Sequence, residues 1–198
     1  EGTPQGGPLS PLLSNLMLDV LDKELERRGH HAVRYADDCN IYVRSRRAGE
    51  RVMANITRFL SERLKLRVNQ QKSAVARPWA RKFLGFSFTS QQQPKRRIAP
   101  KAVERFKERI RELTSRTRGV SIERMAGDLT QYLRGWLGYF GKCETTRVLE
   151  SLAKWTRRRL RSAIWKQWKR DTVRFAELRK RGVGKDLAAQ TAGSAHGP

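Results

Sequence analysis

Tyr35-Ala36-Asp37-Asp38 places two carboxylates side by side between two short runs with the composition of β-strands. The upstream run, residues 31–35, is half apolar, and the downstream run, residues 40–43, is rich in β-branched and aromatic residues. The pattern predicts a β-hairpin with the acidic pair at its tip. Adjacent carboxylates repel, and a divalent cation that prefers oxygen ligands, such as Mg²⁺ or Mn²⁺, relieves the repulsion. Aspartate is also a good turn former, so the tetrapeptide alone leaves both interpretations open.

The second large feature is positive charge. The 198-residue chain has 43 Lys and Arg against 19 Asp and Glu, for a formal net charge of +24. The excess is concentrated in residues 95–186, which hold 27 basic and 10 acidic residues. Such a charge favours a polyanionic partner, and nucleic acid is the first candidate because its phosphates bind Lys and Arg. A membrane surface is a weaker candidate, because the basic segment lacks an isolated amphipathic anchor. No apolar run approaches the roughly 18 residues of a membrane span.

Cysteine usage indicates the compartment. Cys39 and Cys143, with the three histidines of the chain, cannot form a zinc site by themselves and do not predict a disulfide framework. We therefore expect a reducing, cytoplasmic location.

Hydrophobic spacing predicts an α+β part followed by a helical part. The expected boundaries are a first domain over residues 1–90, a linker over 91–99, a helical domain over 100–181 and a flexible tail over 182–198. The expected elements are a Gly/Pro-rich loop over 3–9, a helix from Ser10 to Gly29, the hairpin over 31–44, a helix over 48–65, strands near 72–76 and 82–88, and helices over 100–117, 121–140, 144–170 and 171–181.

Several motifs follow one another in a characteristic order. Pro4 to Pro11, the acidic hairpin, Asn69 to Ser73 and Phe83 to Phe86 resemble the palm of a reverse transcriptase. The later segments Gly135-Trp-Leu-Gly-Tyr-Phe140 and Trp155 to Arg170 resemble the thumb and maturase domain of bacterial group II intron reverse transcriptases. The resemblance covers nearly all of residues 1–185. It implies an α+β fold, with a partial palm (an antiparallel sheet with helices) followed by an all-α thumb and maturase domain.

The resemblance also implies an activity. Members of this family are RNA-directed DNA polymerases that use two-metal phosphoryl transfer with Mg²⁺, or Mn²⁺ in its place. By the resemblance, Asp37 and Asp38 are the catalytic residues and the metal ligands, with Asp38 as the partner of Asp37. Residues expected to contact primer or nucleotide are Gln5, Gly6, Tyr35, Ala36, Lys72 and Gly85. Two simpler explanations stay open: residues 4–11 form only a tight entry into a helix, and Lys72 is only a solvated lysine.

The helix predicted over residues 144–170 has two faces at 100° per residue. We expect its core face to contain Leu149, Ala153, Thr156, Leu160, Ile164 and Trp168. The opposite face interleaves cations with an aromatic ring, which suits RNA because aromatic rings stack on unpaired bases. The expected RNA-binding residues are Arg157, Arg158, Arg161, Trp165, Lys169 and Arg170. The alternative is that Trp165 packs against another helix.

The partners implied by the resemblance are group II intron RNA, an RNA template with a DNA primer, and deoxynucleoside triphosphates. No membrane partner is implied, the location is the bacterial cytoplasm near the nucleoid, and the oligomeric state stays open. In the family a further Asp on an earlier strand completes the metal site. This sequence begins at Glu1, in the loop after that strand, so we expect that the chain alone incorporates no nucleotide.

Two other functions are compatible with parts of the sequence. A non-catalytic maturase module would bind intron RNA and assist splicing without chemistry of its own. A basic DNA-binding structural protein would account for the charge, but not for the palm-like motifs.

Overall fold

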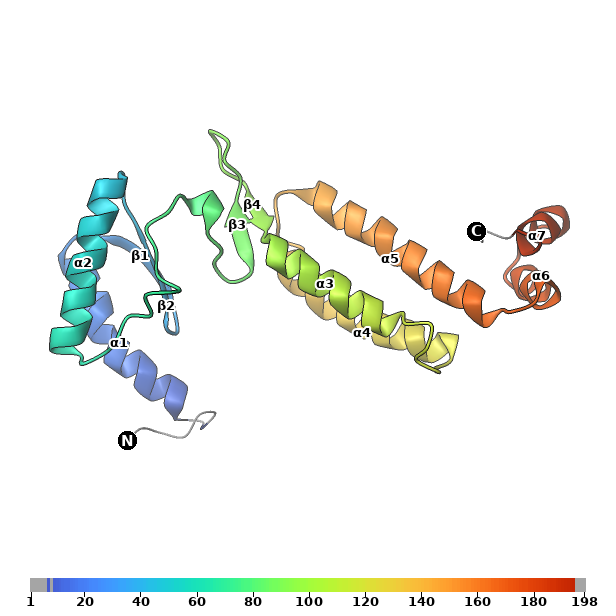
Figure 1. The fold of residues 1–198 in the computed structure, drawn as a ribbon, viewed down its shortest axis with the longest axis horizontal. Helices are drawn as coiled ribbons and strands as arrows, with labels where there is room; N and C mark the ends of the chain where they lie inside the picture. The colour runs from blue at the N-terminus through green and yellow to red at the C-terminus, as the bar shows by residue number, and fades with distance from the viewer. Residues whose placement is uncertain (1–6, 8, 195–198) are drawn as a thin grey trace. The chain divides into compact units, whose positions relative to one another are not determined.

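The computed structural model describes residue 7 and residues 9–194, and it divides into two units, Glu1–Phe83 and Leu84–Pro198 (Figure 1). The first unit contains helix α1 (Ser10–Arg27), strands β1 (His31–Tyr35) and β2 (Asp38–Tyr42), and helix α2 (Arg46–Arg63). The two strands form an antiparallel hairpin, as the sequence predicts. A 3-10 turn, Pro78–Ala80, follows later in this unit.

Local signals set the helix ends beside the hairpin. Gly29 has a φ of 68°, a left-handed conformation that glycine adopts without steric cost. The backbone N–H of His30 then donates to the carbonyl of Leu25 at 2.9 Å and closes the end of α1. At the start of α2, the hydroxyl of Ser45 accepts from the N–H of Ala48 at 3.2 Å, as an N-cap.

The core of the first unit lies between the two helices and one face of the hairpin. Leu21 and Leu25 of α1 and Ile56 of α2 are buried, and Cys39 and Ile41 of β2 pack against them. In α1 this core involves Leu18, Leu21 and Leu25. Other apolar side chains that share one face of α1 at helical spacing are exposed, among them Leu12, Leu13, Leu16 and Val20.

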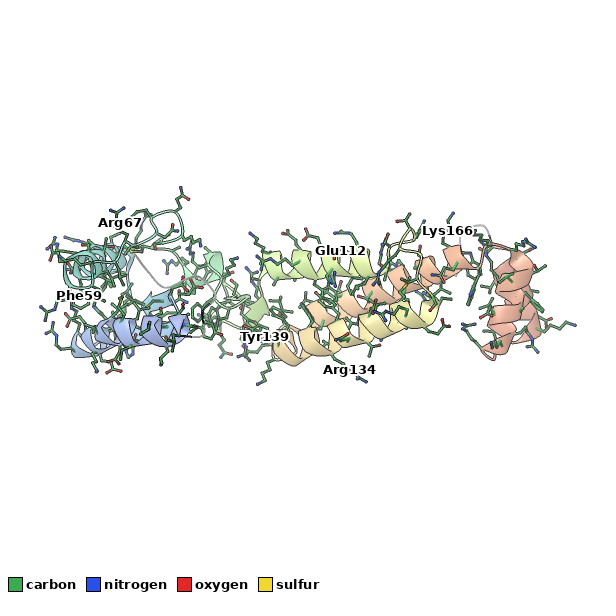
Figure 2. The ribbon with its side chains drawn as sticks, turned by 90° about the horizontal axis from the view of Figure 1, so that it is seen from below. Phe59, Arg67, Glu112, Arg134, Tyr139 and Lys166 are labelled. Atoms are coloured by element: carbon green, nitrogen blue, oxygen red, sulfur yellow. The ribbon has the colours of Figure 1, made fainter. Side chains whose placement is uncertain are left out.

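The second unit is mainly helical. Strands β3 (Phe86–Phe88) and β4 (Arg96–Ile98) form a short antiparallel pair, and five helices follow among the described residues. These are α3 (Pro100–Leu113), α4 (Ile122–Phe140), α5 (Thr146–Gln167), α6 (Asp171–Lys180) and α7 (Lys185–Ala192). The side chains gathered between α3, α4 and α5 form one core (Figure 2), whose buried members are Phe106, Ile110, Leu113, Met125, Leu129, Leu152 and Ala163.

The structure differs from the predicted boundaries in several places, and the strand expected over residues 82–88 is shortened to β3. Residues 96–98 of the expected linker form β4, because they pair with β3, and the boundary between the two units therefore falls earlier, between Phe83 and Leu84. Residues 72–76 form no strand, since no strand among the described residues pairs with them. The expected flexible tail contains α7, whose Ala188 and Ala192 are buried.

The core between α3, α4 and α5 allows us to predict how much a cavity would destabilise the second unit. Ile110 is fully buried at the centre of the α3–α4–α5 core, so we expect Ile110→Ala to destabilise the second unit by about 2–5 kcal/mol. Thermal unfolding followed by circular dichroism measures this destabilisation. The control is Leu187→Ala on α7, whose side chain is 60% exposed and should change stability by less than about 0.5 kcal/mol. Equal effects of both substitutions would contradict the assigned core.

Candidate functional site

The carboxylate pair lies at the apex of the hairpin. Tyr35 pairs with Asp38, so Ala36 and Asp37 alone form the loop. Ala36 has a φ of 52°, and two-residue hairpin loops favour a positive φ at this first position because it matches the twist of the strands. Both aspartates are exposed. The predicted apex is therefore present and open to solvent.

The strand register separates the two faces of the hairpin. Residues directly opposite each other share a face, and faces alternate along each strand. Arg34 pairs with Cys39, on the face that packs against the helices. Tyr35 pairs with Asp38 on the other face, where Tyr35 is 62% exposed. Asp38 and the Tyr35 ring are thus presented together, away from the core.

Arg34 ties this apex to helix α1. Its guanidinium donates through Nε to both carboxylate oxygens of Asp22, at 2.8 and 3.0 Å. Its Nη1 donates to Oδ1 of Asn15 at 3.0 Å and to the carbonyl oxygen of Ala36 at 2.9 Å. The hydrogen bond with Asp22 raises the pKa of Arg34, which therefore keeps its charge. One side chain thus joins the turn backbone to two helix residues.

Sequence reasoning did not identify Arg34 as part of the site. The available signal was an arginine directly before the acidic motif, together with an aspartate in the preceding helix. The pairing of two residues twelve positions apart becomes evident only once α1 and β1 lie side by side.

The donor set at the apex fits Mg²⁺ or Mn²⁺ in part. Mg²⁺ is commonly held by one or two carboxylates, with water and substrate phosphates completing its shell. Asp37 and Asp38 supply such a pair, and the part of the chain that the structure describes contains no cluster of three or more His, Cys, Asp or Glu side chains. The neighbouring Cys39 lies on the opposite face, and burial raises the pKa of its thiol. The apex therefore offers two hard ligands, without a closed cage.

The other residues expected to contact primer or nucleotide have different settings. Gln5 and Gly6 lie outside the described residues. Lys72 is exposed in a turn, where its backbone N–H donates to the backbone carbonyl of Asn69 at 3.2 Å. Among the described residues, neither a strand nor a hydrogen bond places its side chain, so the phosphate role of Lys72 stays a prediction.

Gly85 belongs to the second unit, and its lack of a side chain has a local cause. Its φ is 76°, and a Cβ atom there would lie 2.9 Å from the Phe140 ring. Next to it, the Tyr139 hydroxyl donates to the carbonyl oxygen of Leu84 at 2.8 Å. The Phe140 ring thus accounts for the absence of a side chain at residue 85. The contact of Gly85 with primer or nucleotide, which the resemblance implies, stays a prediction.

Helix α5 carries a group of exposed cations. At 100° per residue, Lys154, Arg157, Arg158 and Arg161 fall within an arc of about 100°, here called the cation face. All four are exposed, and none has a hydrogen-bond or ion-pair partner for its side chain among the described residues. Lys166 lies further along the same helix (Figure 2). Within the described chain, no helix is both long and apolar enough to cross a membrane.

The expected stacking role of Trp165 is not supported by its position. The same helical spacing directs it towards the cation face, but the ring is only 9% exposed. Helix α6 covers it, with the guanidinium carbon of Arg174 lying 4.6 Å from the ring centroid. Arg181 covers Trp168 in the same way, at 4.8 Å. Trp165 therefore packs against another helix, and Trp168 is buried as predicted.

Comparison with known protein families gives two matches along the chain. Residues 1–88, which contain the carboxylate hairpin, match the family described as Reverse transcriptase (RNA-dependent DNA polymerase). Residues 103–182, which contain the cation face, match the family described as Group II intron, maturase-specific domain. No curated protein matches the chain.

The first part of the chain is therefore a reverse transcriptase domain, and the second is a maturase-specific domain. With both in this order, the chain belongs to the group II intron reverse transcriptase/maturases. Only residues 89–102 and 183–198 lie outside the two matched ranges.

The Arg34 contacts generate a test of the apex. We expect Arg34→Gln to accelerate hydrogen exchange at the Asp38 amide about tenfold or more, because the turn loses its bond to the side chain that reaches α1. Amide exchange followed by NMR measures the change. Arg67→Gln, which removes an exposed charge elsewhere in the first unit, is the matched control (Figure 2). Unchanged protection in Arg34→Gln would show that the apex is rigid without this side chain.

Proposed function

We infer that the chain serves RNA-directed DNA synthesis by a group II intron protein, with its first unit contributing metal-binding carboxylates and its second unit binding intron RNA. The observation that carries this proposal is the pair of exposed aspartates at the apex of the hairpin, Asp37 in the two-residue turn and Asp38 at the start of β2, within the reverse transcriptase domain. A hairpin that needed only a turn former has no use for a second exposed carboxylate beside the first.

The chemistry assigned to the apex follows from its groups. Asp37 and Asp38 would hold Mg²⁺, or Mn²⁺, through their carboxylate oxygens. A metal at that position supplies charge stabilisation for the attacking and leaving oxygens of phosphoryl transfer. Arg34 keeps the turn in place, so the carboxylates need little reorganisation to bind a cation. The exposed Tyr35 ring, on the same face as Asp38, offers an apolar surface for a primer end, and the small Ala36 leaves room for it.

The cation face of α5 supports the RNA-binding half of the proposal. Its guanidinium and ammonium groups lack protein partners among the described residues, which leaves them available to phosphate. The proposed partners are group II intron RNA, a primed RNA template and deoxynucleoside triphosphates. Such partners would be met in a bacterial cytoplasm, close to the nucleoid.

One observation favours a second candidate function. The described residues supply two carboxylates at the apex and no third acidic ligand near them. A binding-only maturase, which assists the folding of intron RNA, would need just the cation face. The two functions differ in their dependence on Asp37, since only synthesis requires it.

Metal binding tests the apex directly. We expect the double variant Asp37→Asn/Asp38→Asn to bind Mn²⁺ at least about fivefold more weakly than the unaltered chain, because both anionic ligands are removed. Electron paramagnetic resonance of free Mn²⁺ gives the affinity. Asp186→Asn, which removes an exposed carboxylate from α7, should leave it unchanged. Equal Mn²⁺ affinity in all three proteins would contradict the proposal that Asp37 and Asp38 bind a divalent cation.

An extension assay on a primed RNA template separates the two candidate functions. We expect no incorporation by this chain alone, because a further acidic ligand is needed. Templated extension that Asp37→Ala abolishes would contradict that expectation, and it would also exclude the binding-only alternative.

Salt dependence tests the cation face. We expect the affinity for a structured RNA to fall steeply with salt, and Arg157→Gln/Arg161→Gln to reduce the slope of log K against log salt by about 2, because each neutralised phosphate adds roughly 0.9 to that slope. Fluorescence anisotropy of labelled RNA measures both quantities. The control, Arg134→Gln/Lys142→Gln, removes the same charge from exposed positions outside α5, of which Figure 2 labels Arg134. Identical slopes for the two variants would mean that net charge alone attracts RNA.

A further inference from the structure

An open hollow of about 450 Å³ lies at the end of the hairpin opposite to the carboxylates. The pair His31 and Tyr42 closes this end, and His31 lies four residues along β1 from Tyr35, or about 13 Å at the rise of a strand. No acidic residue lines the hollow within the described chain. Its polar lining consists of Arg28, His30, Arg44, Arg51 and Asn55.

The arginines that line this basic hollow differ in whether their guanidinium groups already have a partner in the protein. Arg28 forms an ion pair with Glu24 at 2.6 Å and lies over the Phe59 ring, 5.8 Å from its centroid. Arg44 and Arg51 are exposed, and within the described residues their side chains have neither a hydrogen bond nor an ion pair. Two guanidinium groups thus border one hollow without an acceptor from the described protein.

The start of α2 adds positive charge to the same place. Ala48, in the first turn of the helix, lines the hollow, and the first turn contains no acidic residue. The N-terminal end of a helix has a partial positive charge and favours anions. Three arginines lie at or just before the start of α2, namely Arg44, Arg46 and Arg47. Among the described residues, only Arg46 of these three forms an ion pair, with Glu50 at 2.9 Å. This accumulation is unfavourable until a negative group binds.

Phosphate is the anion that this lining fits. Guanidinium groups bind phosphate oxygens through paired, charge-assisted hydrogen bonds, and the Asn55 amide offers further donors. Because Arg44 and Arg51 are exposed, the hollow can admit a phosphate that is part of a long polymer. We propose that the basic hollow binds a backbone phosphate of RNA, at a site separate from both the hairpin apex and the cation face. This inference rests on the proposed function, which makes RNA the ligand of the chain.

The test compares double variants of the full chain in RNA affinity. Arg44→Gln/Arg51→Gln should weaken binding of a labelled structured RNA about tenfold and lower its salt slope by about 0.9 to 1.8, as expected when one or two phosphates are no longer neutralised. The matched control is Arg63→Gln/Arg67→Gln. It removes two exposed arginines from the same unit outside the hollow, neither of which has a side-chain partner among the described residues, and it should weaken binding less than about threefold. Circular dichroism confirms that each variant is folded.

Free phosphate is the other source of the same chemistry, and an NMR arm distinguishes it. Inorganic phosphate should shift the amide resonances of Ala48, Val52 and Asn55 in the unaltered chain, but not in Arg44→Gln/Arg51→Gln. If these shifts occur while the variant binds RNA normally, the ligand is free phosphate and the RNA assignment is overturned.

The remaining outcomes separate the inference from the proposed function. Equal weakening by the hollow variant and its control would overturn the hollow as a site. If Arg157→Gln/Arg161→Gln abolishes RNA binding while the hollow variant keeps it, this inference fails and the cation face stands. An unaltered chain that binds no RNA would overturn both.

Discussion

The pairing of Tyr35 with Asp38 across a two-residue turn is the constraint on which the candidate site depends. Side chains alternate along a strand, so a register shift of one residue would exchange the two faces of the hairpin. Asp38 would then point at the helices, and Arg34 would point at solvent. The observed register gives one face to the contact with Asp22 and the other to the exposed carboxylate. The same pair of strands therefore anchors the hairpin to α1 through Arg34 and exposes the carboxylate of Asp38 to solvent.

In the second unit, the main constraint is that a helix with many cations must stay folded despite their mutual repulsion. Helix α5 has seven Lys and Arg residues and one Glu. Repulsion among these charges is offset by the core that α5 shares with α3 and α4. That core continues into a row of aromatic rings, in which Trp136 lies 4.4 Å from Phe106 and 4.8 Å from Phe140 between ring centroids. The apolar side of the bundle thus allows the opposite side to stay highly charged.

The features predicted correctly from sequence were those with local causes. The hairpin follows from two short strand-forming runs, and the helix end at Gly29 follows from one glycine with a positive φ. The errors concern contacts between distant residues. Strand β4 pairs with β3 across an intervening loop, and Trp165 is covered by Arg174 from a later helix. Helical periodicity gives the direction of the Trp165 side chain, but it cannot indicate that another element will pack there.

The contact between Arg174 and Trp165 limits which amino acids position 174 can accept. Arg174 lies over the indole, donates through Nε to the carbonyl oxygen of Trp168 at 2.8 Å, and so closes the end of α5. A planar, delocalised cation can do both at once, whereas the ammonium group of lysine is a point charge on a flexible stem. At this position it is therefore shape, and not charge alone, that decides whether a basic residue is interchangeable with another.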